Sequence, residues 1–435
     1  MIDKEIPIPD RAVLVGMVKK GESQEALDSS LDELEGLLKT AGGECVARLT
    51  QNKDAPDPRT MIGSGKAAEL AYICACNDVT LVVFDCELSP SQIRNLEAIM
   101  GDEVRVIDRS MLILDIFALH AVTGEGKLQV ELAQLKYTAP RLMGKGTELS
   151  RLGGGIGTRG PGESQLETDR RHLQRRIRAL EEQIEEIAKN RKTMRAARDR
   201  SGIPTIAIVG YTNAGKSTLL NHLTDAGILA EDKLFATLDP TTRKFELPCG
   251  ETVLLTDTVG FIKKLPHHLV SAFHSTLEEA ACADMLLIII DASDPEFEEQ
   301  IAVTEELLDD LGAIGKPTLY VFNKCDRGFA RLSEIGKANE RDDTVYISAL
   351  TGQGVDLLVA KIEALVTDGK RRVTYFIPNR EAGALNDLYR LATVEDVDYG
   401  ADGMTVVALA DARARGTMKK YAIDDIPESK EDCEE

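Results

Sequence analysis

The sequence predicts a mainly α/β protein in four parts, and three patterns indicate this fold class. β-branched runs alternate with amphipathic helices through the first 108 residues. A heptad-spaced series of leucines and isoleucines follows, which is typical of packed helices. Further on, a glycine-rich turn joins an apolar strand to a helix. We expect an N-terminal α/β domain (1–109), a helical hairpin (110–200), a second α/β domain (201–369) and a small C-terminal α+β domain with an acidic tail (370–435).

Composition narrows the classes of function. The chain has 435 residues, of which 43% are hydrophobic, enough for several cores. No apolar run approaches the ~18 residues of a membrane span, and the first ten residues lack a signal-peptide core. The eight cysteines show no metal-ligand spacing, so reduced thiols are expected. These features predict a cytoplasmic monomer.

Charge is distributed unevenly along the chain. The net charge of −21 argues against indiscriminate binding to nucleic acid. Residues 141–200 nevertheless carry 15 Lys and Arg against 9 Asp and Glu. A basic segment in an acidic protein is typical of contact with one anionic partner, and the alternative is a solvated helix face.

The first domain is predicted from alternating elements. Strands are expected at 11–18, 45–50, 79–86 and 104–108, and helices at 24–40, 65–77 and 89–100. This alternation predicts a mostly parallel sheet. The turn Gly63-Ser64-Gly65-Lys66 could hold an anion at a helix start, but it lacks P-loop spacing, so a plain helix start is favoured.

The basic segment is predicted to form a helical hairpin. One helical stretch is expected over 110–139, weakened at Gly124 and Gly126 and stopped by Pro140. A second helix is expected from about Ser164 to Arg200, after a glycine-rich loop of about 25 residues. Arginines flank this loop and suit phosphate contacts. We interpret the loop as a probe directed at RNA, and the alternative is a flexible hinge.

The third part contains a P-loop pattern. The strand 205–209 leads into Gly210-Tyr211-Thr212-Asn213-Ala214-Gly215-Lys216-Ser217, and a helix follows. In such a loop backbone N–H groups point at phosphate oxygens, Lys216 reaches the outer phosphates and Ser217 offers its hydroxyl to Mg²⁺. The alternative is an ordinary strand-to-helix turn. Such a turn would not need the glycine, lysine and serine residues at the spacing of a P-loop.

Two further motifs predict guanine as the base. The strand that ends in Asp257-Thr258-Val259-Gly260 is expected to place a carboxylate that holds Mg²⁺ through water, and an amide at Gly260 that could sense a γ-phosphate. In Asn323-Lys324-Cys325-Asp326 the carboxylate can accept two N–H bonds that guanine offers and adenine does not. Lys324 would lie along the base, and the backbone of Ser348-Ala349-Leu350 would meet its oxygen. GTP is therefore the expected nucleotide.

The segment 234–243 is expected to be a switch that closes over Mg²⁺. Its residues alone do not decide whether Thr237, Thr241 or Thr242 is the metal ligand. Phe261 stands where many GTPases carry a glutamine that orients water, so intrinsic hydrolysis should be slow and need a partner. Asn213 suggests a K⁺ ion near the β,γ-phosphates.

These residues resemble the HflX family of translational GTPases. The resemblance rests on the motifs at 210–218, 235–241 and 257–262, and on two stretches that common GTPases lack, 126–135 and 160–171. It implies a P-loop GTPase domain, binding to the large ribosomal subunit and its RNA, and splitting or rescue of stalled ribosomes under stress. It also implies that the hairpin tip probes the peptidyl-transferase region and that Thr237 ligates Mg²⁺. Association with ribosomes, or peripherally with a membrane, is expected.

The predicted site combines all of these motifs. We expect Lys216, Thr237 and Gly260 to act in catalysis, and Ser217, Thr237 and Asp257 to hold Mg²⁺. The residues expected to bind GTP or GDP are Gly210, Tyr211, Thr212, Asn213, Ala214, Gly215, Lys216, Ser217, Thr218, Phe235, Ala236, Thr237, Leu238, Asp239, Asp257, Thr258, Val259, Gly260, Asn323, Lys324, Cys325, Asp326, Ser348, Ala349 and Leu350. The alternative functions are a GTP-dependent adaptor for another protein and an RNA-remodelling NTPase that uses the N-terminal domain.

Overall fold

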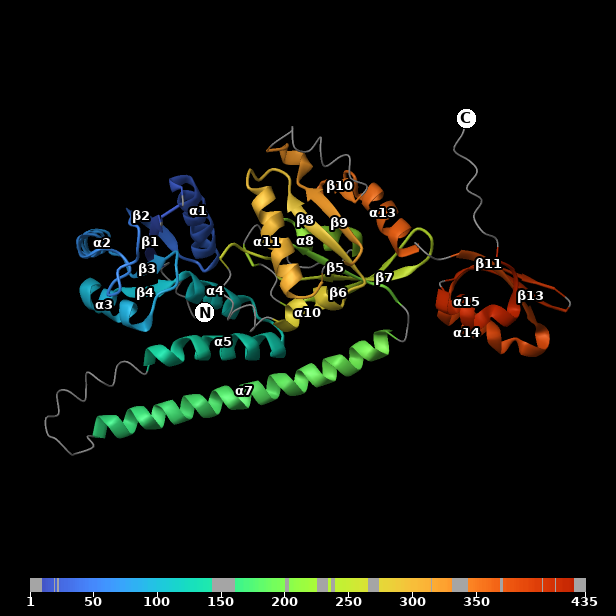
Figure 1. The fold of residues 1–435 in the computed structure, drawn as a ribbon, viewed down its shortest axis with the longest axis horizontal. Helices are drawn as coiled ribbons and strands as arrows, with labels where there is room; N and C mark the ends of the chain where they lie inside the picture. Colours follow the sequence, from blue (N-terminus) through green and yellow to red (C-terminus); the bar gives the residue numbers. More distant parts are fainter. Residues whose placement is uncertain are drawn as a thin grey trace, which may run out of the picture.

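The computed structural model arranges the chain as three sheet-containing parts and a long pair of helices (Figure 1). It describes residues 10–18, 20–21, 23–142, 161–199, 203–224, 234–235, 239–264, 274–313, 315–330, 343–367, 371–400, 402–410 and 412–425.

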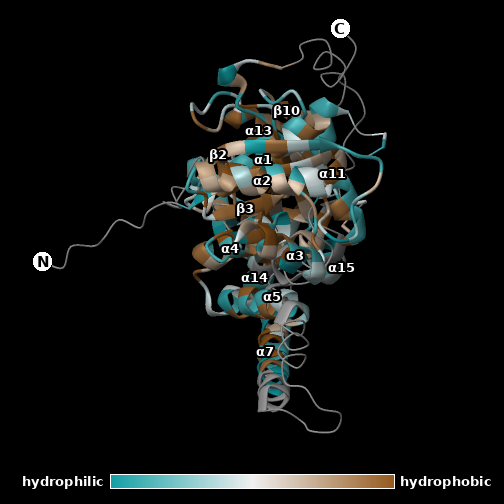
Figure 2. Ribbon diagram, turned by 90° about the vertical axis from the view of Figure 1, so that its left-hand side faces the viewer, coloured by the Kyte–Doolittle hydropathy of each residue, from teal (hydrophilic) through white to brown (hydrophobic). Residues whose placement is uncertain are grey.

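The first part is a four-stranded parallel sheet, as predicted. Its strands are β1 (Arg11–Val18), β2 (Glu44–Asn52), β3 (Leu81–Phe84) and β4 (Arg105–Asp108), in the order β2-β1-β3-β4. The helices between them are α1 (Gln24–Thr40), α2 (Ser64–Cys76) and α3 (Pro90–Met100). Successive residues of β1 enter two different cores, one shared with α1 and the other with α2 and α3. Both faces are therefore covered, as a parallel sheet requires, and the apolar strand β3 lies inside (Figure 2).

The helical part differs from the prediction at two points. The stretch expected as one helix is two, α4 (Arg109–His120) and α5 (Gly124–Leu142), because the backbone is extended at Ala121 (φ −66°, ψ 109°). Pro140 does not stop α5, since it lies in the last turn, where a missing N–H bond affects little of the helix.

The second long helix, α7, spans Pro161–Asp199, and its 39 residues would extend about 58 Å. It runs antiparallel to α5, with ion pairs Arg176–Glu131, Lys136–Glu181 and Arg191–Glu125. Leu180 is fully buried in this seam, whereas the arginines at 170, 171, 175, 176 and 178 are exposed. The hairpin is thus present, and the loop at its tip, 143–160, lies outside the described residues.

The third part is a six-stranded sheet in the order β10-β9-β8-β5-β7-β6. Its strands are β5 (Thr205–Gly210), β6 (Thr241–Glu246), β7 (Thr252–Asp257), β8 (Met285–Asp291), β9 (Thr318–Asn323) and β10 (Thr344–Tyr346), and β6 alone pairs antiparallel. The helices are α8 (Lys216–Thr224), α10 (His274–Cys282), α11 (Phe297–Asp310) and α13 (Val355–Thr367), with a 3-10 turn at Cys325–Arg327. The carboxyl ends of the parallel strands therefore meet at one edge.

The C-terminal part is a four-stranded antiparallel sheet in the order β12-β13-β11-β14. Its strands are β11 (Arg371–Pro378), β12 (Thr393–Tyr399), β13 (Gly403–Ala410) and β14 (Ala422–Asp425), of which β14 was not predicted. The helices α14 (Gly383–Leu391) and α15 (Ala412–Met418), with 3-10 turns at Asn379–Glu381 and Lys419–Tyr421, cover one face. The hydroxyl of Thr393 donates to Glu251, which joins this part to the third part.

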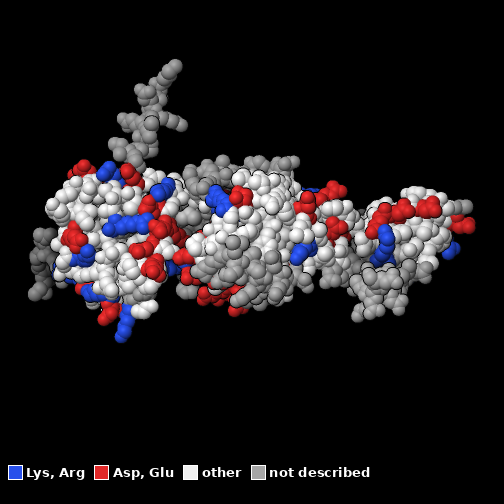
Figure 3. Space-filling view, turned by 90° about the horizontal axis from the view of Figure 1, so that it is seen from above, with Lys and Arg blue, Asp and Glu red and all other residues white. Residues whose placement is uncertain are grey.

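Charges of both signs are interspersed on the face seen in Figure 3. Among the ion pairs of the described residues, Lys39 pairs with Glu35 and Arg48 with Asp32. Within the described ranges, no helix is both long and apolar enough to cross a membrane.

Candidate nucleotide-binding site

The P-loop lies between β5 and α8, at the carboxyl edge of the six-stranded sheet. Gly215 has φ 98°, and the adjoining Asn213 has φ 61°, a left-handed conformation that asparagine tolerates. A Cβ at Gly215 would overlap the side-chain amide of Asn323. Glycine is therefore required here because the end of β9 packs directly on the loop.

Lys216 and Ser217 begin α8, and their polar atoms lie beside Asp257. The Lys216 ammonium donates to the carbonyl oxygens of Gly210 (3.0 Å) and Tyr211 (2.7 Å). Burial lowers the pKa of Lys216 to about 8, which the nearby Asp257 carboxylate partly opposes. The fully buried site thus holds a cation ready for an anionic ligand.

Two of the three residues predicted to hold Mg²⁺, Ser217 and Asp257, are in contact in the structure. The Ser217 hydroxyl donates to Asp257 Oδ2 at 2.6 Å, and Asp257 is fully buried at the end of β7. Hydroxyl and carboxylate oxygens are the ligands that Mg²⁺ prefers, so these two residues fit the ion. A bound Mg²⁺ would neutralise charge on the phosphate oxygens.

Gly260 lies directly against the P-loop. A Cβ at this position would sit 2.8 Å from Thr212 Cα and 2.9 Å from Lys216 Nζ. The amide of Phe261 donates to the Gly210 carbonyl (3.1 Å), and the Thr212 amide donates to the Phe261 carbonyl (2.7 Å). Any larger residue at 260 would separate the two segments that are expected to enclose the γ-phosphate.

The predicted guanine motifs come together on the other side of the loop. Asn323 donates to the Ala214 carbonyl (2.8 Å) and accepts from the Ala349 amide (2.9 Å), which joins three motifs. The Ser348 hydroxyl donates to Asp326 at 2.6 Å and so orients the carboxylate, a role for the side chain that the sequence did not suggest. Lys324 pairs with Asp291 at 2.7 Å, and Leu350 is 74% exposed.

The described residues of the predicted switch segment contact the helical part of the chain. Phe235 is buried against Phe117 of α4, with ring centroids 4.7 Å apart, and Asp239 accepts hydrogen bonds at the start of α5. Thr241 and Thr242 belong to β6 and pair with Asp257 and Thr256 of β7. The predicted residues Ala236, Thr237 and Leu238 lie outside the described residues.

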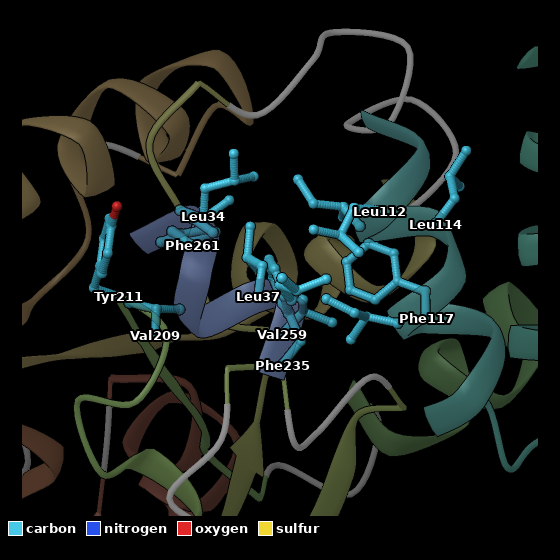
Figure 4. Close-up of a cluster of buried hydrophobic side chains, with 14 of the residues drawn as sticks. Leu34, Leu37, Leu112, Leu114, Phe117, Val209, Tyr211, Phe235, Val259 and Phe261 are labelled. Atoms are coloured by element: carbon cyan, nitrogen blue, oxygen red, sulfur yellow. The ribbon is translucent and has the colours of Figure 1, made fainter. Parts of the chain in front are cut away.

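Phe261 is 1% exposed and belongs to a core that spans several parts of the chain. Figure 4 shows it near Leu34 of α1, with Leu37, Val259 and Phe235 close by and Phe117 on the other side of the cluster. Phe261 thus packs the third part of the chain against the first, which explains an apolar residue where a water-orienting glutamine is common.

A polar network beside this core was missed by sequence reasoning. The Arg109 guanidinium pairs with Glu33 and with Asp85 (2.8 Å), and the Tyr211 hydroxyl donates to Glu33. Burial, and then the neighbouring Glu33 charge, raise the pKa of Tyr211 well above its usual value. Tyr211 belongs to the P-loop pattern, but no motif marks Glu33, Asp85 or Arg109, and the four residues come from four distant segments.

The same network receives a side chain from the segment after Gly260. The Lys264 ammonium donates to Asp85 (2.6 Å) and Ser30 (2.9 Å), and the Lys263 amide donates to the Tyr211 hydroxyl (2.6 Å). Lys264 has φ 56°, a conformation that costs energy in a residue with a side chain. A cleft of about 790 Å³ lies alongside, lined by Glu33, Thr212, Asn213 and other polar residues.

Comparisons with known proteins agree with this organisation. Three protein-family models match: GTP-binding GTPase N-terminal over residues 28–118, GTP-binding GTPase Middle Region over 120–198, and 50S ribosome-binding GTPase over 205–324. GTPase HflX of Lacrimispora saccharolytica is 49% identical over 92% of this chain and 93% of its own length. GTPase HflX of Escherichia coli is 44% identical, covering 86% and 87%. A GTP-binding protein of Sulfolobus solfataricus solved with GDP is 27% identical, with a TM-score of 0.45, over 82% of this chain and 99% of that chain.

Proposed function

The chain belongs to the HflX family of GTPases, and from this premise we propose that it uses GTP to bind the large ribosomal subunit and to split or rescue stalled ribosomes under stress. The observation that carries the proposal is the joining of the nucleotide site to the base of the hairpin. Phe235 and Asp239, on either side of the expected metal ligand Thr237, contact α4 and α5. A conformational change at the nucleotide site can therefore be transmitted to the helical hairpin, which would enter the ribosome.

The proposed hydrolysis divides the work among residues of one sheet edge. Lys216 would hold the outer phosphates and Ser217, Thr237 and Asp257 would hold Mg²⁺, while the Gly260 amide would bind the γ-phosphate. Asp326, held by Ser348, would select guanine. Because Phe261 is buried in the core and offers no polar atom to water, the ribosome would supply the element that accelerates hydrolysis.

The test is co-sedimentation of the full chain with large ribosomal subunits. We expect binding with a non-hydrolysable GTP analogue, weak binding with GDP, and loss of binding when residues 144–162 are deleted. A chain with Glu182→Gln, an exposed change on α7, serves as the matched control and should bind like the wild type. The proposal would be contradicted if binding were equal with the GTP analogue and GDP, or if the deletion left binding unchanged. Either result would favour an adaptor for another protein.

A K⁺ ion would fit the same mechanism. Asn213 is exposed at the outer turn of the P-loop and lines the cleft beside it. We propose that K⁺ accelerates hydrolysis through this residue. The hydrolysis rate should fall when Na⁺ replaces K⁺, and Asn213→Ala should remove the difference between the two salts. An unchanged rate in the wild type would refute this part.

A further inference from the structure

Thr212 of the P-loop has a buried hydroxyl for which the described part of the chain supplies no hydrogen-bond partner, and the residue is only 6% exposed. Two buried threonines at the end of β7 differ in this respect. The Thr258 hydroxyl donates to the Ile208 carbonyl (2.8 Å), and the hydroxyl of Thr256 shares a hydrogen bond with that of Thr242 (2.9 Å). A buried hydroxyl without a partner costs free energy, because it has lost its hydrogen bonds to water. A missing partner of this kind is expected where a ligand binds.

The side chain of Thr212 is held in place by the segment that follows Gly260. The Thr212 amide donates to the Phe261 carbonyl at 2.7 Å, and Tyr211 forms a parallel bridge with Phe261. Threonine is branched at Cβ and has few allowed rotamers, so a fixed backbone also restricts its hydroxyl and methyl groups. The hydroxyl is therefore positioned before a nucleotide binds.

Thr212 lies where the outer phosphates are expected. A Cβ built on Gly260 would sit 2.8 Å from the Thr212 methyl carbon and 2.9 Å from Lys216 Nζ, so the three residues meet at one point. The Lys216 ammonium has three N–H groups and gives two of them to backbone carbonyls. The Thr212 hydroxyl is attached to the same carbon as this methyl, so it lies close to the groups that are expected to bind the γ-phosphate.

We propose that the Thr212 hydroxyl donates a hydrogen bond to a γ-phosphate oxygen of GTP, and that this side chain helps the P-loop distinguish GTP from GDP. A hydrogen bond from a hydroxyl to an anionic oxygen is stronger than one between neutral groups. GDP lacks the γ-phosphate and would leave the hydroxyl without this partner. The inference rests on the proposed nucleotide site and assigns a role to a position at which the P-loop pattern accepts any residue.

Thr212→Val and Thr212→Ser separate the hydroxyl from the rest of the side chain. Valine keeps the branched shape and removes the hydroxyl, whereas serine keeps the hydroxyl and removes the methyl. We expect Thr212→Val to weaken binding of a non-hydrolysable GTP analogue by about 10- to 100-fold, and to change GDP affinity by less than about twofold. Thr212→Ser should stay within about threefold of the wild type for both nucleotides. Titration calorimetry of the full chain in the presence of Mg²⁺ measures these affinities.

Thermal unfolding without nucleotide gives a second readout, which does not depend on activity. Thr212→Val removes a hydroxyl that has no partner, so the unfolding midpoint should stay unchanged or rise by about 1–3 °C. Thr304→Val in α11 is the matched control, because the Thr304 hydroxyl is also buried but donates to the Gln300 carbonyl (2.7 Å). This variant should lower the midpoint by about 1–3 °C and leave both nucleotide affinities unchanged.

The inference would be overturned if Thr212→Val lowered the unfolding midpoint and weakened binding of GDP as much as binding of the GTP analogue, since the hydroxyl would then have a structural role. A slower hydrolysis rate with unchanged affinity would also contradict it, because the hydroxyl would then act on the attacking water. Failure of the wild type to bind either nucleotide would instead refute the nucleotide site itself.

Discussion

Lys216 is the residue whose chemistry the fold changes most. In the sequence it is a lysine at the P-loop position. That position predicts that Lys216 binds the outer phosphates, but it does not predict the pKa of its ammonium group. The structure leaves Lys216 only 7% exposed, its ammonium donates to two backbone carbonyls, and this burial lowers the pKa to about 8. A phosphate ligand would stabilise the protonated form, so the pKa should rise when nucleotide binds.

The pH dependence of GTP binding follows from this shift. Below about pH 8 the free protein already carries the charge on Lys216, and affinity should be constant. Above pH 8 the free protein loses that proton while the complex keeps it, so affinity should fall by up to about tenfold per pH unit. Titration calorimetry between pH 6.5 and 9.5 measures the effect. Guanosine, which lacks phosphates, is the control; a parallel decline for guanosine would assign the effect to the base instead.

Asp326 carries the second prediction at this scale. Asp326→Asn keeps the size of the side chain but replaces an acceptor with a donor, so one guanine N–H would face an N–H. We expect a loss of GTP affinity of about 10²- to 10⁴-fold. Xanthosine triphosphate, whose base has an oxygen in place of the exocyclic amine, should bind the variant better than GTP. Asp294→Asn is the control on the same protein, and equal loss of both nucleotides would point to misfolding.

At the scale of elements, the periodicity of the sequence predicted most helices and strands, and contacts at a distance decided the rest. The single helix expected over 110–139 breaks before Gly124, where the Thr123 hydroxyl accepts from the Gly126 amide and the distant Asp239 accepts from the Val122 and Thr123 amides. The edge strand β6 (Thr241–Glu246) was not predicted, and its first three residues were read as part of a switch. All of its residues but Phe245 are polar, and they gain their strand pairing from β7. A local sequence pattern does not show which distant segment of the chain will pair with it.

The seam between α5 and α7 gives a prediction for these elements. Leu180 is fully buried on α7, so Leu180→Ala should lower the free energy of unfolding by about 2–5 kcal/mol. Glu182→Ala, two residues along the exposed face, should change it by less than about 0.5 kcal/mol. Urea unfolding followed by circular dichroism compares the two. Similar stabilities would mean that the heptad seam does not hold the helices together.

For the whole molecule, the buried ions between the first and third parts are the main electrostatic feature. Arg109 is 2% exposed and Asp85 is 4% exposed, and both lie in a network that also takes in Glu33, Tyr211 and Lys264. Such an arrangement is stable only when complete, because each remaining charge lacks water. The network therefore joins the domains in one relative position.

Removing the central cation tests this arrangement. Arg109→Leu would leave Glu33 and Asp85 with less compensation, and we expect a loss of about 3–5 kcal/mol in the free energy of unfolding. Arg105→Leu is the matched control: Arg105 pairs with Asp10 on the surface, with 63% of its side chain exposed, and should cost less than about 1 kcal/mol. Thermal unfolding resolves the two. Equal losses would show that burial of the network contributes little.

What the sequence alone determined is the local chemistry. The P-loop, Asp257, Gly260 and the Asn323–Asp326 motif are contiguous patterns, and each sits at a strand end that periodicity also predicts. The tertiary structure alone decided how these motifs connect to the rest. Ser348 meets Asp326, Asp239 meets Gly126, and Phe261 turns into a core shared with α1. The reason is physical. A motif encodes what one backbone segment can bind, whereas a buried ion pair or a hydrogen bond between distant segments depends on which segments the packing brings within hydrogen-bonding distance.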